Sequence, residues 1–216
     1  MNGIYRFESF TTSNCYVVTP EENSNICYLI DLPPDVNEVL DYVNKKNLSI
    51  GAVFLTHGHY DHSLGLQTYS DGNVYMSLED EFLARNPAEQ LKSFLIQDDI
   101  SLDKYEGTLK NIEDYDNEDI VIHNNPGHTK GSISFLFKEI GTIFTGDFVF
   151  ADGVGRTDLY SGDIVQMKDS INNVFLPLNK DYEVFPGHGK SDTVKNILNY
   201  NSYLKEFIDD WRCKGN

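Results

Sequence analysis

The stretch that decides the fold covers residues 56–62 and reads Thr56-His57-Gly58-His59-Tyr60-Asp61-His62. It follows the apolar segment 52–55 and holds three of the six histidines of the chain. In a loop that leaves a strand, His57 and His59 can point the same way, whereas Asp61 and His62 turn toward a neighbouring point. One loop can therefore supply ligands to two adjacent metal ions, and its nitrogen and carboxylate donors suit zinc, iron or manganese.

Three further candidate ligands stand at the ends of apolar segments later in the chain. His128 lies in NPGHT (125–129), His188 lies in FPGHG (185–189), and Asp147 follows the apolar run 143–145. The two oxygens of one carboxylate can bridge two cations, so we expect Asp147 to lie between two metal ions. The ligands expected are His57, His59 and His128 for one ion, and Asp61, His62 and His188 for the other.

The sixth histidine, His123, precedes His128 on an expected strand. We interpret it as a strand residue, or as a residue that supports a ligand without touching the metal ion.

Composition and charge exclude several classes of function. The chain has 216 residues, 40% of them hydrophobic, and a formal net charge of −17. Such a charge repels phosphate backbones, so we expect no nucleic acid partner. No apolar run approaches the roughly 20 residues of a membrane span, and the first residues do not resemble a secretory signal. We therefore expect a cytoplasmic protein without membrane contact, as a monomer or a small homo-oligomer.

Short apolar and β-branched runs predict strands in both halves of the chain. The pattern mixes strands and helices without a regular βαβ repeat, and no linker divides it, so we expect one domain over residues 1–216. The expected strands cover residues 14–19, 26–31, 51–55, 119–123, 133–138, 141–145 and 182–185.

Helices are expected at three places. After two prolines, Val36, Leu40 and Val43 mark one face of a helix, and a weaker signal covers residues 88–97 of the polar segment 78–115. A longer apolar stripe predicts one helix over residues 194–211, formed by Val194, Ile197, Leu198, Leu204, Phe207, Ile208 and Trp211.

Taken together, the HxHxDH loop, PGHT, the Gly-Asp pair and the late Gly-His pair resemble the metallo-β-lactamase superfamily. The resemblance implies an α/β fold, a four-layer αβ/βα sandwich with two mixed sheets and the metal ions at one edge. It also implies two divalent metal ions, with zinc favoured and iron or manganese as alternatives. All seven ligand positions are filled: His57, His59, Asp61, His62, His128, Asp147 and His188.

Three shorter stretches are similar to the short glyoxalase II-like hydrolases, relatives of hydroxyacylglutathione hydrolase: GVGRTDL (153–159), PGHG (186–189) and NYNSYL (199–204). This resemblance implies a thioesterase that cleaves S-2-hydroxyacyl thioesters, such as S-D-lactoylglutathione, through a metal-bound hydroxide. Asp61 and Asp147 are the catalytic carboxylates that it implies. Arg156 stands where the family places a cation near the substrate carboxylate, although an ordinary surface salt bridge is the alternative for this residue.

Other activities of the superfamily stay open at this point. A mononuclear iron persulfide dioxygenase shares the GRTD stretch, and lactonases and phosphodiesterases use related sites. True β-lactamases lack the bridging carboxylate, so Asp147 argues against that activity. We expect this chain to lack the long helical C-terminal extension that helps full-length glyoxalase II bind glutathione, so the thiol carrier of the expected small anionic thioester stays open.

Overall fold

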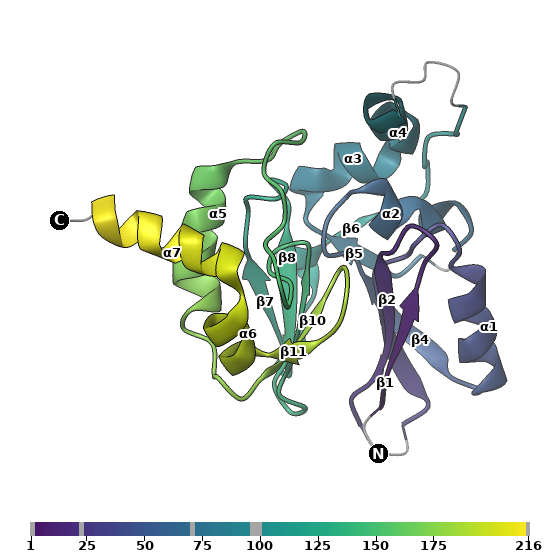
Figure 1. Cartoon of the computed structure of the whole chain (residues 1–216). Coiled ribbons are helices and arrows are strands. Elements are labelled where there is room, and N and C mark those ends of the chain that lie inside the picture. The colour runs from purple at the N-terminus through teal and green to yellow at the C-terminus, as the bar shows by residue number, and fades with distance from the viewer. Residues whose placement is uncertain (1–2, 22–23, 70–71, 96–100, 215–216) are drawn as a thin grey trace. The chain divides into compact units, whose positions relative to one another are not determined.

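The computed structural model describes residues 3–21, 24–69, 72–95 and 101–214, and the side chains of these residues except 93–95 and 209–214. The chain forms two compact units, Met1–Asp116 and Asn117–Asn216 (Figure 1). Among the described residues, no helix is both long enough and apolar enough to cross a membrane.

The first unit is built around a six-stranded mixed sheet in the order β1-β2-β3-β4-β5-β6 (Figure 1). The strands from β1 to β3 pair antiparallel, and those from β3 to β6 pair parallel. Its strands are β1 (Gly3–Glu8), β2 (Asn14–Thr19), β3 (Ile26–Ile30), β4 (Ser49–Phe54), β5 (Val74–Met76) and β6 (Lys110–Asn111). Its helices are α1 (Asn37–Lys45), α2 (Tyr60–Ser63), α3 (Glu81–Arg85) and α4 (Pro87–Leu95), with short 3₁₀ turns at Leu64–Gln67, Leu78–Asp80 and Ile112–Asp114.

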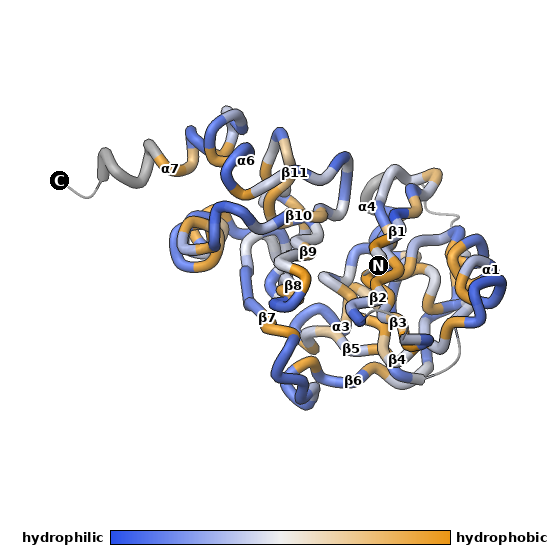
Figure 2. Tube along the Cα trace, turned by 90° about the horizontal axis from the view of Figure 1, so that it is seen from below, coloured by the Kyte–Doolittle hydropathy of each residue, from blue (hydrophilic) through white to orange (hydrophobic). Residues whose placement is uncertain are grey.

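One face of this sheet carries the apolar core of the first unit. Because side chains alternate along a strand, Val17 and Leu29 point to the same face and pack there with Val39 and Val43 of α1. The polar side chains of α1 point away from this core, so the helix has both blue and orange turns in Figure 2. The expected amphipathic helix after the two prolines is thereby confirmed.

The second unit contains a five-stranded mixed sheet in the order β11-β10-β9-β8-β7, in which only β9 and β10 pair parallel. Met167, Ile171, Val194 and Leu204 cover its apolar face from the helices. Its strands are β7 (Ile120–Asn124), β8 (Ile133–Phe137), β9 (Thr142–Gly146), β10 (Glu183–Pro186) and β11 (Asp192–Thr193). Its helices are α5 (Ile164–Ser170), a π-helical turn at Ile171–Phe175, α6 (Val194–Tyr200) and α7 (Ser202–Lys214).

Two mixed sheets with flanking helices confirm the expected α/β class. Every expected strand is present to within about two residues, the usual uncertainty of element boundaries. Strands β1, β5, β6 and β11 had no sequence prediction. The polar segment 78–115 contains α4 near the expected position, and also α3 and β6.

The expectation of one helix over residues 194–211 is wrong, because α6 ends at Tyr200 and α7 begins at Ser202. Asn201 between them has a non-helical backbone, and its side-chain oxygen accepts the N–H of Leu204 at 2.8 Å. An asparagine in this position caps the new helix and satisfies one of its free N–H groups. Trp211, the last residue of the expected stripe, lies outside the described side chains.

Candidate metal centre

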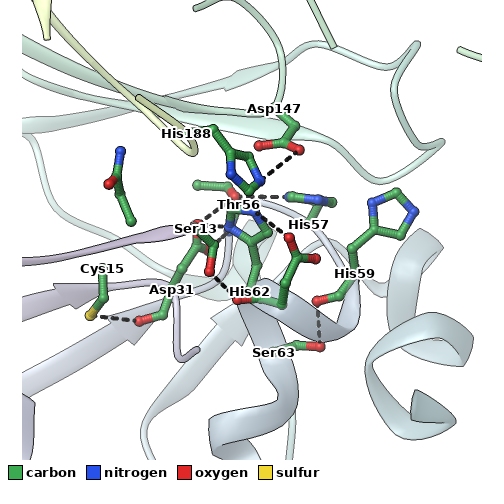
Figure 3. A network of polar contacts seen from close by, with 12 residues as sticks. Ser13, Cys15, Asp31, Thr56, His57, His59, His62, Ser63, Asp147 and His188 are labelled. Carbon is green, nitrogen blue, oxygen red and sulfur yellow. Dashed lines mark hydrogen bonds and ion pairs between the residues drawn. The ribbon is translucent and has the colours of Figure 1, made fainter. Parts of the chain in front are cut away.

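The first group of predicted ligands lies in the first unit, in the loop after β4 and in the short helix α2. The carboxylate of Asp31, at the end of β3, organises this loop (Figure 3). It accepts hydrogen bonds from the backbone N–H of Thr56 at 2.7 Å, from the Thr56 hydroxyl at 2.9 Å and from Nδ1 of His62 at 2.8 Å. Asp31 thus joins the end of one strand to two points of the ligand loop.

These hydrogen bonds assign the tautomers of two histidines. Nδ1 of His62 donates to Asp31, so its Nε2 carries the lone pair that a metal ion requires. The Thr56 hydroxyl donates to Asp31 and therefore accepts from Nδ1 of His57 at 3.1 Å. His57 then also presents Nε2 as its ligand atom. One carboxylate that is not itself a predicted ligand thus determines the tautomers of two predicted ligands.

Burial raises the pKa of the Asp31 carboxyl, while His62 and the hydrogen bonds from Thr56 act in the opposite direction. The residue is 1% exposed and has a positive φ of 62°, a backbone conformation that few residues other than glycine adopt. A buried carboxylate is unfavourable unless several donors surround it. Sequence reasoning missed Asp31, although an acidic residue at the end of an apolar strand was a signal that could have found it.

The backbone of the ligand loop is held at several more points. The Ser13 hydroxyl donates to the carbonyl of Asp61 at 2.7 Å, and the Ser63 hydroxyl donates to the carbonyl of His59 at 2.8 Å. The ligand nitrogens of His57 lie within 4.8 Å of those of His59 and of His62. Oδ2 of Asp61 lies 3.6 Å from Nε2 of His62. The four predicted ligands of this loop are therefore brought together within the first unit.

The second group of predicted ligands lies in the second unit and centres on Asp147, the first residue after β9. Its Oδ2 atom lies 3.5 Å from Nε2 of His128 and 3.5 Å from Nε2 of His188 (Figure 3 shows Asp147 and His188). These separations exceed the usual length of a hydrogen bond. Two ligand atoms on one tetrahedral ion, each about 2.1 Å from it, lie about 3.4 Å apart. The spacing of this donor set therefore fits a cation better than direct hydrogen bonds.

The GRTD stretch supports these ligands through its backbone. Nδ1 of His128 donates to the carbonyl of Arg156 at 2.7 Å, so Nε2 of His128 is also the available ligand atom. A Cβ atom on Gly155 would lie 1.7 Å from the carbonyl oxygen of Asp147, which only a glycine can avoid. Residues 155 and 156 thus shape the surroundings of His128 and Asp147 without using their side chains.

The Arg156 side chain makes a two-point ion pair with Asp158, with N–O distances of 2.7 and 2.8 Å. The guanidinium lowers the pKa of the Asp158 carboxyl to about 2. Both side chains are more than half exposed. The surface ion pair considered as the alternative is therefore present, and the anion-binding role of Arg156 stays a prediction.

Two polar residues near the second group differ in role. Asn201 donates to the carbonyls of Phe150 and Gly153 at 3.1 and 2.9 Å, so the break between α6 and α7 supports the loop that follows Asp147.

His123 lies opposite Ser134 in the pairing of β7 with β8, and burial lowers its pKa. Among the described residues, His123 belongs to neither group of ligands. Its interpretation as a strand residue agrees with this position.

The chain belongs to the metallo-β-lactamase superfamily, a superfamily of metal-dependent hydrolases, because the sequence model of that superfamily matches residues 9–188. It is 30% identical to the hydroxyacylglutathione hydrolase GloC of Haemophilus influenzae over 200 residues, which cover 88% of this chain and 92% of that protein.

Two solved structures have the same fold. The crystal structure of the BLEG-1 B3 metallo-beta-lactamase has a TM-score of 0.79 at 24% identity and covers 94% of this chain and 99% of its own. The structure of TTHA1623 in a di-iron-bound form has a TM-score of 0.78 at 23% identity, covering 92% of this chain and 98% of its own. These likenesses confirm the metallo-β-lactamase type of α/β sandwich.

Proposed function

We propose that this protein is a binuclear metal-dependent hydrolase, a glyoxalase II-like thioesterase that cleaves S-2-hydroxyacyl thioesters such as S-D-lactoylglutathione. The observation that carries the proposal is the position of Asp147, whose Oδ2 atom is equally distant from Nε2 of His128 and Nε2 of His188. One carboxylate oxygen between two imidazole nitrogens is the arrangement expected of a ligand shared by two cations.

The residues that would hold the ions come from both groups of ligands. One ion would take His57, His59 and His128, and the other Asp61, His62 and His188, with Asp147 common to both. The donor set contains imidazoles and carboxylates without a thiolate, which is typical of catalytic sites that keep an open coordination position. It suits zinc best, and the di-iron form of TTHA1623 supports iron as an alternative. Two such ions supply Lewis acidity, which makes water more acidic and polarises a carbonyl group.

The chain's own residues would orient the ligands, accept a proton and bind the substrate. Asp31 and the Arg156 carbonyl hold the tautomers of His57, His62 and His128, so these three imidazoles do not have to reorient when a substrate binds. Asp61 and Asp147 are carboxylates that can accept a proton or a hydrogen bond from the attacking water. Arg156 would bind the substrate carboxylate. A thiolate leaves readily, so this set needs no separate general acid.

The identity of the substrate is supported by the relative GloC, whose name describes a hydroxyacylglutathione hydrolase. The PGHG stretch supports the same assignment, whereas the GRTD stretch is shared with the persulfide dioxygenases. Asp147 disfavours β-lactam hydrolysis in spite of the shared fold with BLEG-1. A small anionic thioester is therefore the proposed substrate class.

The proposal is tested by adding S-D-lactoylglutathione to the zinc-loaded protein and following the loss of thioester absorbance at several substrate concentrations. We expect a kcat/KM above about 10⁴ M⁻¹s⁻¹, within the usual range of enzymes. Absence of turnover in protein with two bound metal ions would rule out glutathione thioesters.

The same preparation separates the alternatives. Oxygen uptake with a glutathione persulfide by the iron-loaded protein would instead identify a dioxygenase. Hydrolysis of a lactone or a phosphodiester at a higher kcat/KM than the thioester would identify one of the other two activities.

A further inference from the structure

Gln90 of α4 is a buried amide whose hydrogen bonds reach the ligand loop. It is 7% exposed, and it lies in the polar segment 78–115, for which the sequence indicates no role. Its Nε2 atom donates to the carbonyl of Gly58 at 3.0 Å and to the carbonyl of Leu83 at 2.8 Å. Its Oε1 atom accepts the backbone N–H of Tyr60 at 3.0 Å. One side chain therefore holds the residue before His59 and the residue after it.

Further contacts show that the backbone at Gly58 packs tightly against the segment 78–90. The carboxylate of Asp80 accepts the N–H of Gly58 at 3.0 Å. A Cβ atom on Gly58 would lie 2.6 Å from the carbonyl oxygen of Asp80, so the loop passes against the 78–90 segment where only glycine fits. Gln90 also ties this point to α3 through Leu83. The segment is thus a support for the backbone at His59.

Two of the supports of the ligand loop, Asp31 and Gln90, act on different parts of it. Asp31 sets the imidazoles of His57 and His62 through side-chain hydrogen bonds. Gln90 acts instead on the two peptide groups that flank His59, and no hydrogen bond joins it to Asp31 among the contacts of the described residues. The direction of the His59 side chain depends on the backbone that Gln90 holds.

We propose that Gln90 is the positioning residue of His59, and that it determines the affinity of the protein for the metal ion assigned to His59. Asp31 instead determines the tautomers of His57 and His62. The inference rests on the proposed function, because it uses the assignment of His59 to one ion and of Asp61 and His62 to the other. Mutation of a residue that is hydrogen-bonded to a metal ligand typically lowers the metal affinity by about 10–100-fold. Loss of the Gln90 side chain should lower the affinity for the ion assigned to His59 by such a factor. The ion assigned to Asp61 and His62 should stay bound.

The test measures zinc retention by the full-length protein during dialysis against graded concentrations of a chelator, with zinc counted by elemental analysis. Gln90→Met keeps the length of the side chain and removes its three hydrogen bonds. Gln90→Glu keeps the shape and the acceptor for Tyr60, and it removes both donated hydrogen bonds. The matched control is Gln67→Met, because Gln67 is an exposed glutamine of the same unit that donates to the carbonyl of Asp103.

We expect the Gln90 variants to lose one zinc ion at a chelator concentration about 10–100-fold lower than the unmodified protein, and to keep the second ion. The Gln67 variant should behave like the unmodified protein. Cobalt-loaded Gln90→Met should lose part of its visible absorption in parallel, which is a readout independent of activity.

Three results would overturn the inference: retention of both ions as in the unmodified protein, loss of both ions together, or failure of both Gln90 variants to fold, judged by circular dichroism. The last would mean that Gln90 serves stability alone. If the unmodified protein itself binds no zinc, the proposed function fails first, so the two failures are distinguishable.

Discussion

The carboxylate of Asp31 lies 2.8 Å from Nδ1 of His62, and through the hydroxyl of Thr56 it also determines which nitrogen of His57 is available. Asp31, which is not a predicted ligand, thus determines the tautomers of two predicted ligands. The polar atoms of the ligand loop form a hydrogen-bonded network, and the consequences of disturbing it can be measured.

Replacing Asp31 with asparagine should weaken metal binding by about 10–100-fold. An amide nitrogen facing His62 would donate a hydrogen bond, so Nδ1 of His62 would have to accept it and Nε2 would carry the proton in place of the lone pair. A zinc titration in competition with a chelator measures the change. Asp41→Asn, on the exposed side of α1, is the control. Equal zinc affinity in the Asp31 and Asp41 variants would show that the tautomer is not controlled in this way.

Asp147→Ala should lose metal and activity together, because the proposed shared ligand disappears while both neighbouring histidines remain. We expect activity to fall by more than about 100-fold, because mutation of a residue that merely supports a ligand already has effects of up to about that size. Metal content and thioester hydrolysis are measured on the same sample. The control is Asp152→Ala, in an exposed position of the same loop. Full turnover in metal-depleted Asp147→Ala protein would contradict the metal-dependent mechanism.

Arg156→Ala should raise KM for an anionic thioester by about tenfold, the factor that corresponds to one lost charge-assisted hydrogen bond, and should leave a neutral thioester unaffected. Stability should change little, because the ion pair with Asp158 is exposed. The comparison uses S-D-lactoylglutathione and an uncharged thioester of the same acyl group. Asp158→Asn serves as the control, because it frees the guanidinium and should not raise KM. An unchanged KM in Arg156→Ala would leave only the surface ion pair as its role.

Asn201→Ala should lower the free energy of unfolding by about 2 kcal/mol. The buried amide donates to two carbonyls of the loop after Asp147 and caps α7, and leaving buried polar groups without these bonds is costly. Urea denaturation measures the effect. Asn199→Ala, at an exposed position in α6, should be neutral or slightly stabilising, because alanine favours helix. Similar stability of the two variants would contradict the structural role of Asn201.

His123 should contribute to the loss of stability at acidic pH. Burial lowers its pKa in the folded protein, while the unfolded chain binds a proton near the ordinary value of about 6.5. As the pH falls below that value, the unfolded state takes up more protons and becomes favoured, until the folded histidine also titrates. Urea denaturation of metal-free protein at pH 7.5 and 5.5 should therefore show a larger drop for the unmodified chain than for His123→Gln. Equal drops would show that burial of His123 does not influence stability.

The fold was largely predictable from local patterns. Strands β2, β3 and β4 alternate or run apolar over several residues, and α1 carries a clear apolar stripe, so their periodicity indicates their structure. The strand β5 has three residues and escaped prediction, because a segment of that length has too few residues to show a period. The break at Asn201 escaped because the apolar stripe continues across it from α6 into α7.

The candidate ligands were predictable because metal chemistry restricts the residue types, and the histidines and aspartates stand close together in the sequence beside glycines. The residues that support them were not. Asp31 and Gln90 are ordinary residue types, separated from the ligand loop by 25 residues and 30 residues in their closest hydrogen bonds, those to Thr56 and to Tyr60. Asp31 at least follows an apolar strand, which is a signal in the local sequence, whereas nothing in the local sequence distinguishes Gln90 from an exposed glutamine.

The sequence by itself determined the class of this protein, seven of the eleven strands that the structure describes, the helices α1 and α4, and the identity of the candidate metal ligands. These features depend on local spacing and on the donor atoms of single side chains. Only the tertiary structure decided which histidine nitrogen is available as a ligand atom, that Asp31 and Gln90 hold the ligand loop, and that Arg156 lies in an ion pair with Asp158. The physical reason is that a hydrogen bond depends on the positions of two groups in space, and chain folding brings these groups together from distant parts of the sequence.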